Sequence, residues 1–307
     1  MHPSIRWTSF RRFVWRNRPL YIMMIPGLLY FLVFKYVPLA GSVIAFQDYN
    51  VIRGFMYSDW VGFKWFVQLF TFPRFTRLLE NTLLISFYQI IFAFPAPIIL
   101  ASLLNELRQM FFKRTIQTIV YLSHFLSWTI VYGLAYMMFS TQSGLVNNVI
   151  QALGGDAVNF LQSTKLFRPV VVGAGIWKEM GWSAIIFLAA LAGINPSLYE
   201  AAKIDGAGRW KQYVHITLPG LMPAITVLLL LKIGHVMDVG FEQIYVFLSP
   251  VTYSVGDIFD TYAYRAGILG GQFSLTTAIG MFKSVVGFLL LIAANRISRS
   301  ITGESLY

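Results

Sequence analysis

The sequence has 307 residues, of which 57% are hydrophobic and only 12% are charged. Soluble domains carry about a quarter charged residues, so this composition predicts a protein whose solvent is lipid. Lys and Arg number 24 against 13 Asp and Glu, but no polar basic domain accompanies this excess, which argues against a nucleic-acid-binding protein. The chain contains no cysteine, and this excludes disulfides and thiolate chemistry.

The chain begins with a basic tail, residues 1–19, followed by a first apolar stretch at 20–46. A basic start before an apolar stretch is also typical of a secretory signal peptide, which is the alternative here. The apolar core of a signal is about 7–15 residues long, and this stretch is longer. We therefore expect an uncleaved membrane span and a cytoplasmic tail.

Residues 47–80 are expected to form an extracellular loop that is rich in aromatic side chains. Aromatic residues are enriched at the boundary between lipid and water. We expect five of them to anchor the loop there: Trp60, Trp65, Phe70, Phe72 and Phe75.

Beyond this loop, a core at 81–296 contains five further apolar runs of the length that a membrane-crossing helix needs. They lie at about 82–104, 116–139, 169–193, 219–240 and 274–295, and a short tail, 297–307, follows. The expected fold is therefore all-α and polytopic, with six transmembrane helices.

Charge predicts how the chain is oriented in the membrane. Thirteen Lys and Arg residues fall in the segments on the side of the amino terminus, against seven in the opposite loops. Cytoplasmic segments carry the excess of positive residues in membrane proteins. Because the number of spans is even, both termini are predicted to be cytoplasmic.

The segment 195–219, between the fourth and fifth spans, has the pattern of a short helix followed by a turn and a second helix. Asn195 is suited to cap the first helix and Pro196 to occupy its first turn. Asp205 and Gly206 are expected to end it, since glycine tolerates a left-handed exit. Pro219 is expected to stop the second helix and begin the next span. By residue pattern alone, this segment is either an interfacial amphipathic turn or a docking element for a partner.

One spaced pattern in this segment resembles the EAA loop of ABC importer permeases, the binding-protein-dependent inner-membrane components. The pattern is Glu200-Ala201-Ala202, three residues, Gly206, nine residues, Ile216, one residue, and Leu218-Pro219. The resemblance implies the fold of a type I importer permease, in which this loop enters a cleft of an ATPase subunit. The coupling residues that it implies are Glu200, Ala201, Ala202, Asp205, Gly206, Ile216, Leu218 and Pro219.

Other parts of the chain are similar to the LplB-like branch of that family, which is associated with polysaccharide-derived sugars. They are residues 26–50 and 233–248. Residues 81–86 resemble the opening of the permease core, and residues 61–70 resemble the stretch before it in sugar permeases. The resemblance implies a heterodimer with a second related permease, two ATPase subunits and an extracellular solute-binding lipoprotein in a bacterial cell membrane. No P-loop is present, so ATP and magnesium are expected in the ATPase, and this chain is expected to hold no cofactor.

Ionisable residues inside spans cost about 2.5–3.5 kcal/mol on insertion scales and often mark a transport pathway. Lys232, His235 and Glu242 are predicted to share one face of the fifth span, with Asp238 beside it. Aromatic rings suit the apolar faces of sugars. The pathway candidates are Tyr132, Trp177, Lys178, Glu179, Trp182, Lys232, His235, Asp238, Glu242, Tyr262, Tyr264 and Lys283. The alternative for each ionisable candidate is that it belongs to a lysine–carboxylate pair that only holds helices together.

One hypothesis, two alternatives and two exclusions complete the functional prediction. If the transported oligosaccharide contains uronic acids, Lys232 and Lys283 could stabilise its carboxylates. The alternatives are an importer permease for a non-sugar solute, and a passive channel or scaffold. The sequence contains no metalloprotease or nucleophile-elbow motif and only four scattered histidines, so neither a catalytic residue nor a metal site is expected.

Overall fold

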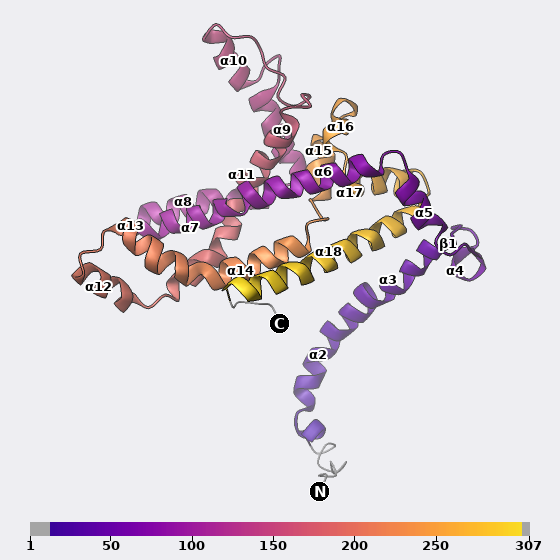
Figure 1. Ribbon diagram of the computed structural model, residues 1–307, viewed down its shortest axis with the longest axis horizontal. Helices are drawn as coiled ribbons and strands as arrows, with labels where there is room; N and C mark the ends of the chain where they lie inside the picture. The colour runs from indigo at the N-terminus through magenta and orange to yellow at the C-terminus, as the bar shows by residue number, and fades with distance from the viewer. Residues whose placement is uncertain (1–12, 303–307) are drawn as a thin grey trace.

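The computed structural model describes residues 13–302, which are mostly helical and include one short antiparallel pair of strands (Figure 1). Within that range, five helices are long and apolar enough to cross a membrane, and a sixth span results when one bent helix pair is counted as a span. Each predicted span overlaps one of these segments. The prediction of an all-α, polytopic membrane fold is therefore confirmed. The tail residues Arg6, Arg11 and Arg12 lie outside the described part of the chain.

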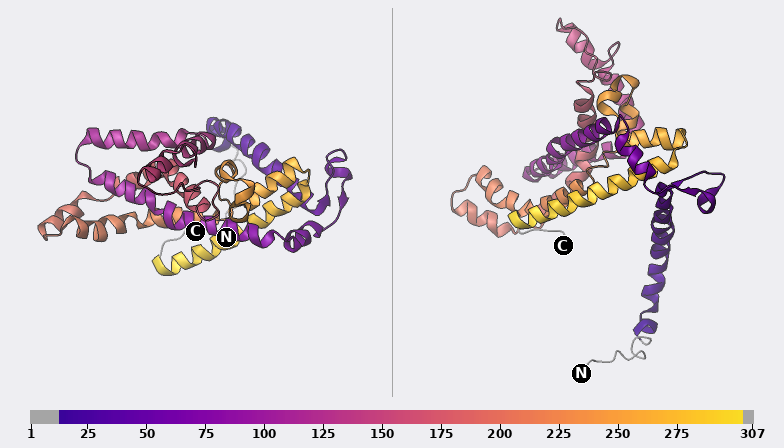
Figure 2. Two further views of the ribbon diagram at one scale, coloured as in Figure 1. Left: turned by 90° about the horizontal axis from the view of Figure 1, so that it is seen from above. Right: turned by 45° about the vertical axis from the view of Figure 1, so that its right-hand side comes forward.

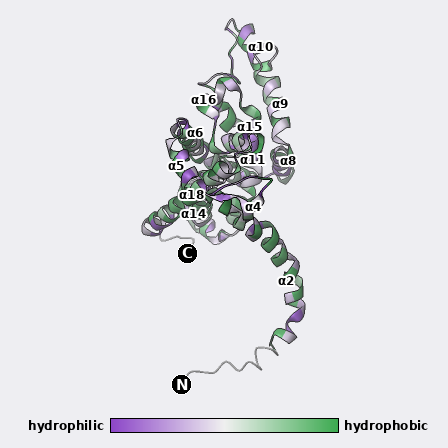
Figure 3. Ribbon diagram, turned by 90° about the vertical axis from the view of Figure 1, so that its right-hand side faces the viewer, coloured by the Kyte–Doolittle hydropathy of each residue, from purple (hydrophilic) through white to green (hydrophobic). Residues whose placement is uncertain are grey.

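The first span projects away from the rest of the chain (Figures 1 and 2). Its helical segments follow one another without a break: α2 (Arg18–Phe31), η1 (Leu32–Tyr36), α3 (Val37–Ala40) and η2 (Gly41–Phe46). Only 6% of its most apolar window is buried, and α2 is mostly hydrophobic (Figure 3). So much exposed apolar surface is unfavourable in water. Lipid or another polypeptide must therefore cover this helix.

A small cap follows the first span. It consists of β1 (Gln47–Asp48), α4 (Gly54–Tyr57), β2 (Asp59–Trp60) and α5 (Lys64–Thr71). The indole N–H of Trp65 donates to the Gln47 carbonyl at 2.8 Å, and the Tyr49 N–H donates to Ser274 Oγ at 3.0 Å. The first bond holds the cap together, and the second fixes it to the beginning of the last helix.

The aromatic side chains of this region divide into two groups. Trp60 and Phe70 are exposed, as expected of membrane-boundary anchors. Trp65, Phe72 and Phe75 instead pack against a buried cluster that includes Phe259 and Ile279. The cap folds back onto the bundle and half-buries these three residues, so they also contribute to its packing.

The membrane bundle is arranged around α11 (Phe167–Ala192), which packs against the second, third and fifth spans. The second span comprises α6 (Phe75–Tyr88), η3 (Gln89–Ala93) and α7 (Pro95–Glu106). At Gly181, a Cβ atom would lie 2.2 Å from the backbone oxygen of Val120. The backbones of α8 (Met110–Leu122) and α11 therefore pack directly against each other, as small residues permit in membrane helices.

The third span is not the straight helix that the apolar run 116–139 predicts. Here α8 and η4 (Ser123–Phe125) meet α9 (Trp128–Phe139) at an angle of 109°. Leu126 is extended, and Ser127 Oγ accepts the Ile130 N–H at 3.3 Å, which caps the new helix. Mean hydropathy does not record this break because the helices on both sides of it are apolar overall. Beyond α9, α10 (Leu145–Ala152) lies apart from the bundle (Figure 1).

The fifth span differs from prediction at both ends. A helix runs without interruption from Arg209 to Gly234 through α13 (Arg209–Gln212), η5 (Tyr213–Thr217) and α14 (Leu218–Gly234). Pro219 therefore does not end a helix. Proline has no backbone N–H to donate, and the π-helical turn η5 before it lets the helix continue without that hydrogen bond. The helix stops at Gly234, and the link that follows reaches Gly240, whose φ is +99°.

The predicted helical face of the fifth span is consequently wrong. Lys232 lies on α14, His235 and Asp238 lie in the non-helical link, and Glu242 lies on α15 (Phe241–Phe247). The chain then passes through η6 (Pro250–Thr252), α16 (Tyr253–Gly256), α17 (Phe259–Ala263) and η7 (Tyr264–Leu269) to α18 (Phe273–Thr302). This last helix includes residues 297–302, which were expected in a tail.

Candidate functional site

The first candidate site is the short helix α12 (Pro196–Ile204), whose two ends form as the residue pattern predicts. Asn195 Oδ1 accepts the Ser197 N–H at 3.0 Å, and Pro196 occupies the first turn. At the other end the Ala207 N–H donates to the Ala202 carbonyl at 2.8 Å, and the Gly206 N–H donates to that of Lys203 at 3.1 Å. Gly206 has a φ of +74°. This pair of bonds around a left-handed glycine is a Schellman cap, which gives the chain a sharp, defined exit.

Side-chain hydrogen bonds hold the turn and α12 against the base of the fifth span. The Gln212 amide donates to the Ala207 carbonyl at 2.7 Å. The hydroxyl of Tyr199 on α12 lies 2.9 Å from Thr217 Oγ1 in the π-helical turn. These bonds join α12 and the turn to the helix that runs from Arg209 to Gly234.

The outer surface of this hairpin is exposed at one end of the bundle (Figures 1 and 2). Leu198, Ile204 and Trp210 have 50%, 87% and 75% of their surface exposed. Glu200, Ala201, Asp205, Gly206 and Pro219 are also exposed, whereas Ala202, Ile216 and Leu218 are half-buried. Grouped exposed apolar side chains indicate an interaction surface. Ile216 and Leu218 belong to the base of the hairpin.

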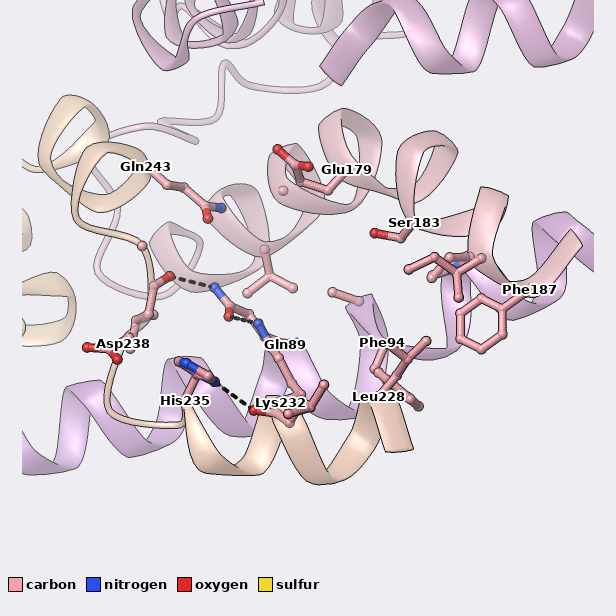
Figure 4. A pocket seen from close by; sticks show the side chains of 18 residues that line it. Gln89, Phe94, Glu179, Ser183, Phe187, Leu228, Lys232, His235, Asp238 and Gln243 are labelled. Carbon is pink, nitrogen blue, oxygen red and sulfur yellow. Dashed lines mark hydrogen bonds between the residues drawn. The ribbon is translucent and has the colours of Figure 1, made fainter. Parts of the chain in front are cut away.

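The second candidate site is a cavity of about 490 Å³ between α11, α14 and η3 (Figure 4). Apolar side chains form one part of its wall, among them Phe94, Phe187 and Leu228. The rest of the wall is polar and comprises Gln89, Glu179, Ser183, Lys232, His235, Asp238 and Gln243. A cavity with apolar surface and a few converging polar groups has the character of a small-molecule site.

A chain of hydrogen bonds fixes Lys232 in this cavity. Its ammonium group donates to Gln89 Oε1 at 3.0 Å, and the Gln89 amide nitrogen donates to the Val239 carbonyl at 3.0 Å (Figure 4). None of the carboxylates in residues 13–302 forms an ion pair with Lys232. Lys232 is thus a cation on the cavity wall whose described partner is neutral.

Glu179 reaches the cavity from α11 and is held by two basic residues. Its Oε1 lies 3.0 Å from Lys178 Nζ, and its Oε2 lies 2.7 Å from His124 Nδ1. Lys178 is only 6% exposed and also donates to the His124 carbonyl at 2.6 Å. The ring of Trp182 stacks on His124 with centroids 4.6 Å apart. Lys178 and Trp182 therefore stabilise the bend of the third span and do not line the cavity.

Asp238 is tied to the last helix. Its Oδ1 lies 2.7 Å from Lys283 Nζ, and Lys283 also forms a close ion pair with Asp260. His235 and Asp238 further line a cavity of about 410 Å³ on the side of Lys283. Lys283 thus bridges the link after α14, α17 and α18.

The remaining pathway candidates lie elsewhere. Trp177 is half-exposed, and Glu242 is exposed on α15. Tyr262 packs on Phe72, and Tyr264 packs on Phe241. Tyr132 lines a separate cavity of about 230 Å³. The structure therefore brings Glu179, Lys232, His235 and Asp238 to one cavity and leaves the other candidates outside it.

Three polar residues of the cavity were missed by sequence reasoning: Gln89, Ser183 and Gln243. Gln89 is 7% exposed within an apolar run, and Gln243 donates to the Val171 carbonyl at 2.7 Å. The pathway candidates predicted from the sequence are all ionisable or aromatic, and these three residues are neither. Uncharged polar side chains inside predicted spans are the signal that would have identified Gln89 and Ser183.

Comparison with known proteins identifies the class. The model of the family described as binding-protein-dependent transport system inner membrane component matches residues 93–303. The chain belongs to this family of membrane permeases, so the resemblance of its EAA-like loop is confirmed.

Several relatives and solved structures are similar over nearly the whole chain. Protein LplB of Bacillus subtilis (strain 168) is 49% identical over 95% of this chain and 92% of its own length. The polygalacturonan/rhamnogalacturonan transport system permease protein YteP of the same organism is also 49% identical, over 95% of this chain and 91% of its own. A chain of a bacterial alginate ABC transporter, crystallised with an alginate pentasaccharide-bound periplasmic protein, matches with a TM-score of 0.88 and 40% identity. That match covers 99% of this chain and 100% of the other.

Proposed function

We propose that this chain is one transmembrane permease subunit of an ATP-driven importer of oligosaccharides and forms half of the translocation pathway. The observation that carries the proposal is the continuous helix from Arg209 to Gly234. One end of this helix is bonded to the exposed hairpin that contains α12, and the other end places Lys232 on the cavity wall. A single rigid element thus connects a docking surface to a polar cavity.

The substrate that we propose is an oligosaccharide released from a polysaccharide, including those with uronic acids. A relative 49% identical to this chain is described as transporting polygalacturonan and rhamnogalacturonan, and a transporter with a 41% identical chain imports the acidic polysaccharide alginate. The cavity supports this choice because sugars combine hydroxyl groups with apolar ring faces. Its wall has both polar groups and the aromatic rings of Phe94 and Phe187.

The partners that we propose are a second related permease, two ATPase subunits that bind ATP and magnesium, and an extracellular solute-binding lipoprotein. The uncovered apolar surface of α2 supports a neighbouring chain in the membrane. The exposed Leu198, Ile204 and Trp210 support docking of the hairpin on another protein.

The proposed orientation places both termini in the cytoplasm of a bacterial cell. It rests on the distribution of Lys and Arg between the two sides. The last turns of α18 also lie at the same end of the bundle as α12, while α5 lies at the other end (Figure 1). In this orientation α12 faces the compartment that contains ATP.

Transport follows when the assembled importer shifts between a conformation that is open to the cytoplasm and one that is open to the outside. Closure of the ATPase pair on ATP displaces α12, and the fifth span carries this displacement to the cavity. The cavity then opens alternately to each side of the membrane. This chain binds the substrate and moves, and hydrolysis takes place in the partner.

The test is to reconstitute this chain with a second permease, the ATPase and the binding protein in lipid. ATP hydrolysis is measured with and without oligosaccharide on the binding protein. We expect stimulation by the loaded protein and its loss in Gly206→Glu, because residue 206 has a positive φ. Gly208→Glu adds the same charge at a φ of −67° and is the matched control.

Two outcomes separate the alternatives. If the chain forms no complex with an ATPase yet conducts solute down a gradient, it is a passive channel. If the complex hydrolyses ATP but only a binding protein loaded with a non-sugar solute stimulates it, the importer has another substrate.

A further inference from the structure

The carboxylates on the cavity wall have charged partners, whereas the lysine on that wall does not. Each of the two carboxylates on its wall is held by a lysine that does not itself line the cavity. Lys178 holds Glu179 at 3.0 Å, and Lys283 holds Asp238 at 2.7 Å. The buried side of each carboxylate is thus paired, as the cost of desolvating a charge requires.

Lys232 is the exception among the intramembrane ions of this cavity. Its ammonium group has three N–H donors, and one of them is directed to the neutral amide oxygen of Gln89. Gln89 is fixed in turn by its bond to the Val239 carbonyl, so its oxygen points to Lys232. The geometry holds a cation at the cavity surface and leaves its charge without a carboxylate in the described chain.

We infer that Lys232 binds a carboxylate of the transported oligosaccharide and that Gln89 positions it, so that this pair selects sugars that contain uronic acids. The inference rests on the proposed function and assigns the charge selectivity of the importer to one residue. Lys283 is excluded from this role, because Asp238 and Asp260 already hold its ammonium group. Of the two lysines predicted to stabilise substrate carboxylates, Lys232 therefore remains and Lys283 does not.

The other groups of the cavity fit the rest of such a sugar. Ser183 and the carboxylate oxygens of Glu179 and Asp238 can bind hydroxyl groups, since carboxylates accept hydrogen bonds. Phe94 and Phe187 offer apolar surface to a ring face. A neutral sugar satisfies these groups equally well, so discrimination by charge falls to Lys232.

The test measures uptake of two sugars into vesicles that contain the reconstituted importer. The sugars are trigalacturonate and its fully methyl-esterified form, which has no charge. The same binding protein delivers each sugar to every variant, so its own preference cancels when the acidic-to-neutral uptake ratio of a variant is divided by that of the wild type.

Four variants isolate the charge of Lys232. Lys232→Gln removes it, and Lys232→Arg retains it. Gln89→Glu keeps the lysine but gives it a carboxylate partner. Lys35→Gln is the matched control, since Lys35 also lies within a span but is exposed on η1 and does not line this cavity.

Because a charge-assisted hydrogen bond contributes more than a neutral one, the ratio is expected to fall roughly 10- to 100-fold in Lys232→Gln. The ratio should also fall in Gln89→Glu. In Lys232→Arg it should stay near the wild-type value, and in Lys35→Gln it should equal that value. A structural role of Lys232 predicts the opposite for Gln89→Glu, in which a new ion pair would preserve uptake of both sugars.

Two results overturn the inference while the proposed function stands. One is an unchanged ratio in a Lys232→Gln variant that still assembles by size-exclusion chromatography, whether or not uptake of both sugars falls. The other is preserved uptake of both sugars in Gln89→Glu. If the wild-type importer assembles and takes up no oligosaccharide with any loaded binding protein, the proposed function itself fails, and the assignment of Lys232 fails with it.

Discussion

Lys283 Nζ lies 2.7 Å from Asp238 Oδ1, which ties the last span to the non-helical link that follows the fifth span. The side chain of Lys283 is 10% exposed, whereas that of Asp238 is 61% exposed. The lysine is therefore the buried member of a pair whose carboxylate reaches the cavity. Its second partner, Asp260, adds α17 to the same junction.

We predict that Lys283→Gln destabilises the protein without changing charge selectivity. Without the ammonium group, Asp238 and Asp260 repel each other, and the cost is about 1–3 kcal/mol since both carboxylates retain some contact with solvent. The thermal unfolding midpoint in lipid nanodiscs should fall, and uptake of acidic and neutral sugars should fall together. A selective loss of the acidic sugar would show that Lys283 also serves the substrate.

We predict that Gly181→Ala weakens the packing of α8 on α11. The new Cβ would lie 2.2 Å from the Val120 carbonyl oxygen, which is backbone and cannot rotate away. Overpacking of this kind costs about 1–3 kcal/mol. The unfolding midpoint of the purified chain should fall accordingly.

Gly173→Ala is the control, because it lies on the same helix with no heavy atom within 4 Å of the added Cβ. Alanine favours a helix over glycine by about 1 kcal/mol, so this variant should match or exceed the wild type in stability. Equal stability of the two alanine variants would contradict direct backbone packing at Gly181.

The sequence predicts the spans and the ends of α12 well, because these depend on local patterns. An apolar run of about 20 residues has few alternatives to a membrane helix. Asn195, Pro196 and Gly206 act within a few residues of their own position, so their roles as cap, first turn and left-handed exit follow from residue type. The EAA-like spacing likewise falls on one continuous hairpin.

The breaks inside spans and the partners of buried ions could not be predicted in this way. The bend at Leu126 and the helix end at Gly234 lie within long, mostly apolar stretches whose few polar residues do not mark a break, and tertiary contacts decide them. Lys178, Lys232 and Lys283 look alike in the sequence, since each is a lysine in an apolar run. Only the fold shows that Glu179 and Asp238 pair with two of them while Gln89 holds the third.

We predict that the bond between Tyr199 and Thr217 transmits motion from α12 to the fifth span. The two oxygens are 2.9 Å apart and join the hairpin to the π-helical turn. Tyr199→Phe keeps the ring and removes only the hydroxyl, which should cost about 0.5–1.5 kcal/mol at this contact. ATP hydrolysis stimulated by the loaded binding protein should fall several-fold, while assembly with the ATPase is retained because the exposed Leu198 and Ile204 are unchanged.

A double-mutant cycle with Thr217→Val distinguishes transmission from general destabilisation. If the hydroxyl pair carries the coupling, either single variant removes it, and the double variant loses little more stimulation than each alone. Additive losses would mean that the two hydroxyl groups act independently, and the link between α12 and the cavity would then depend on the helix backbone through Arg209 and Gln212.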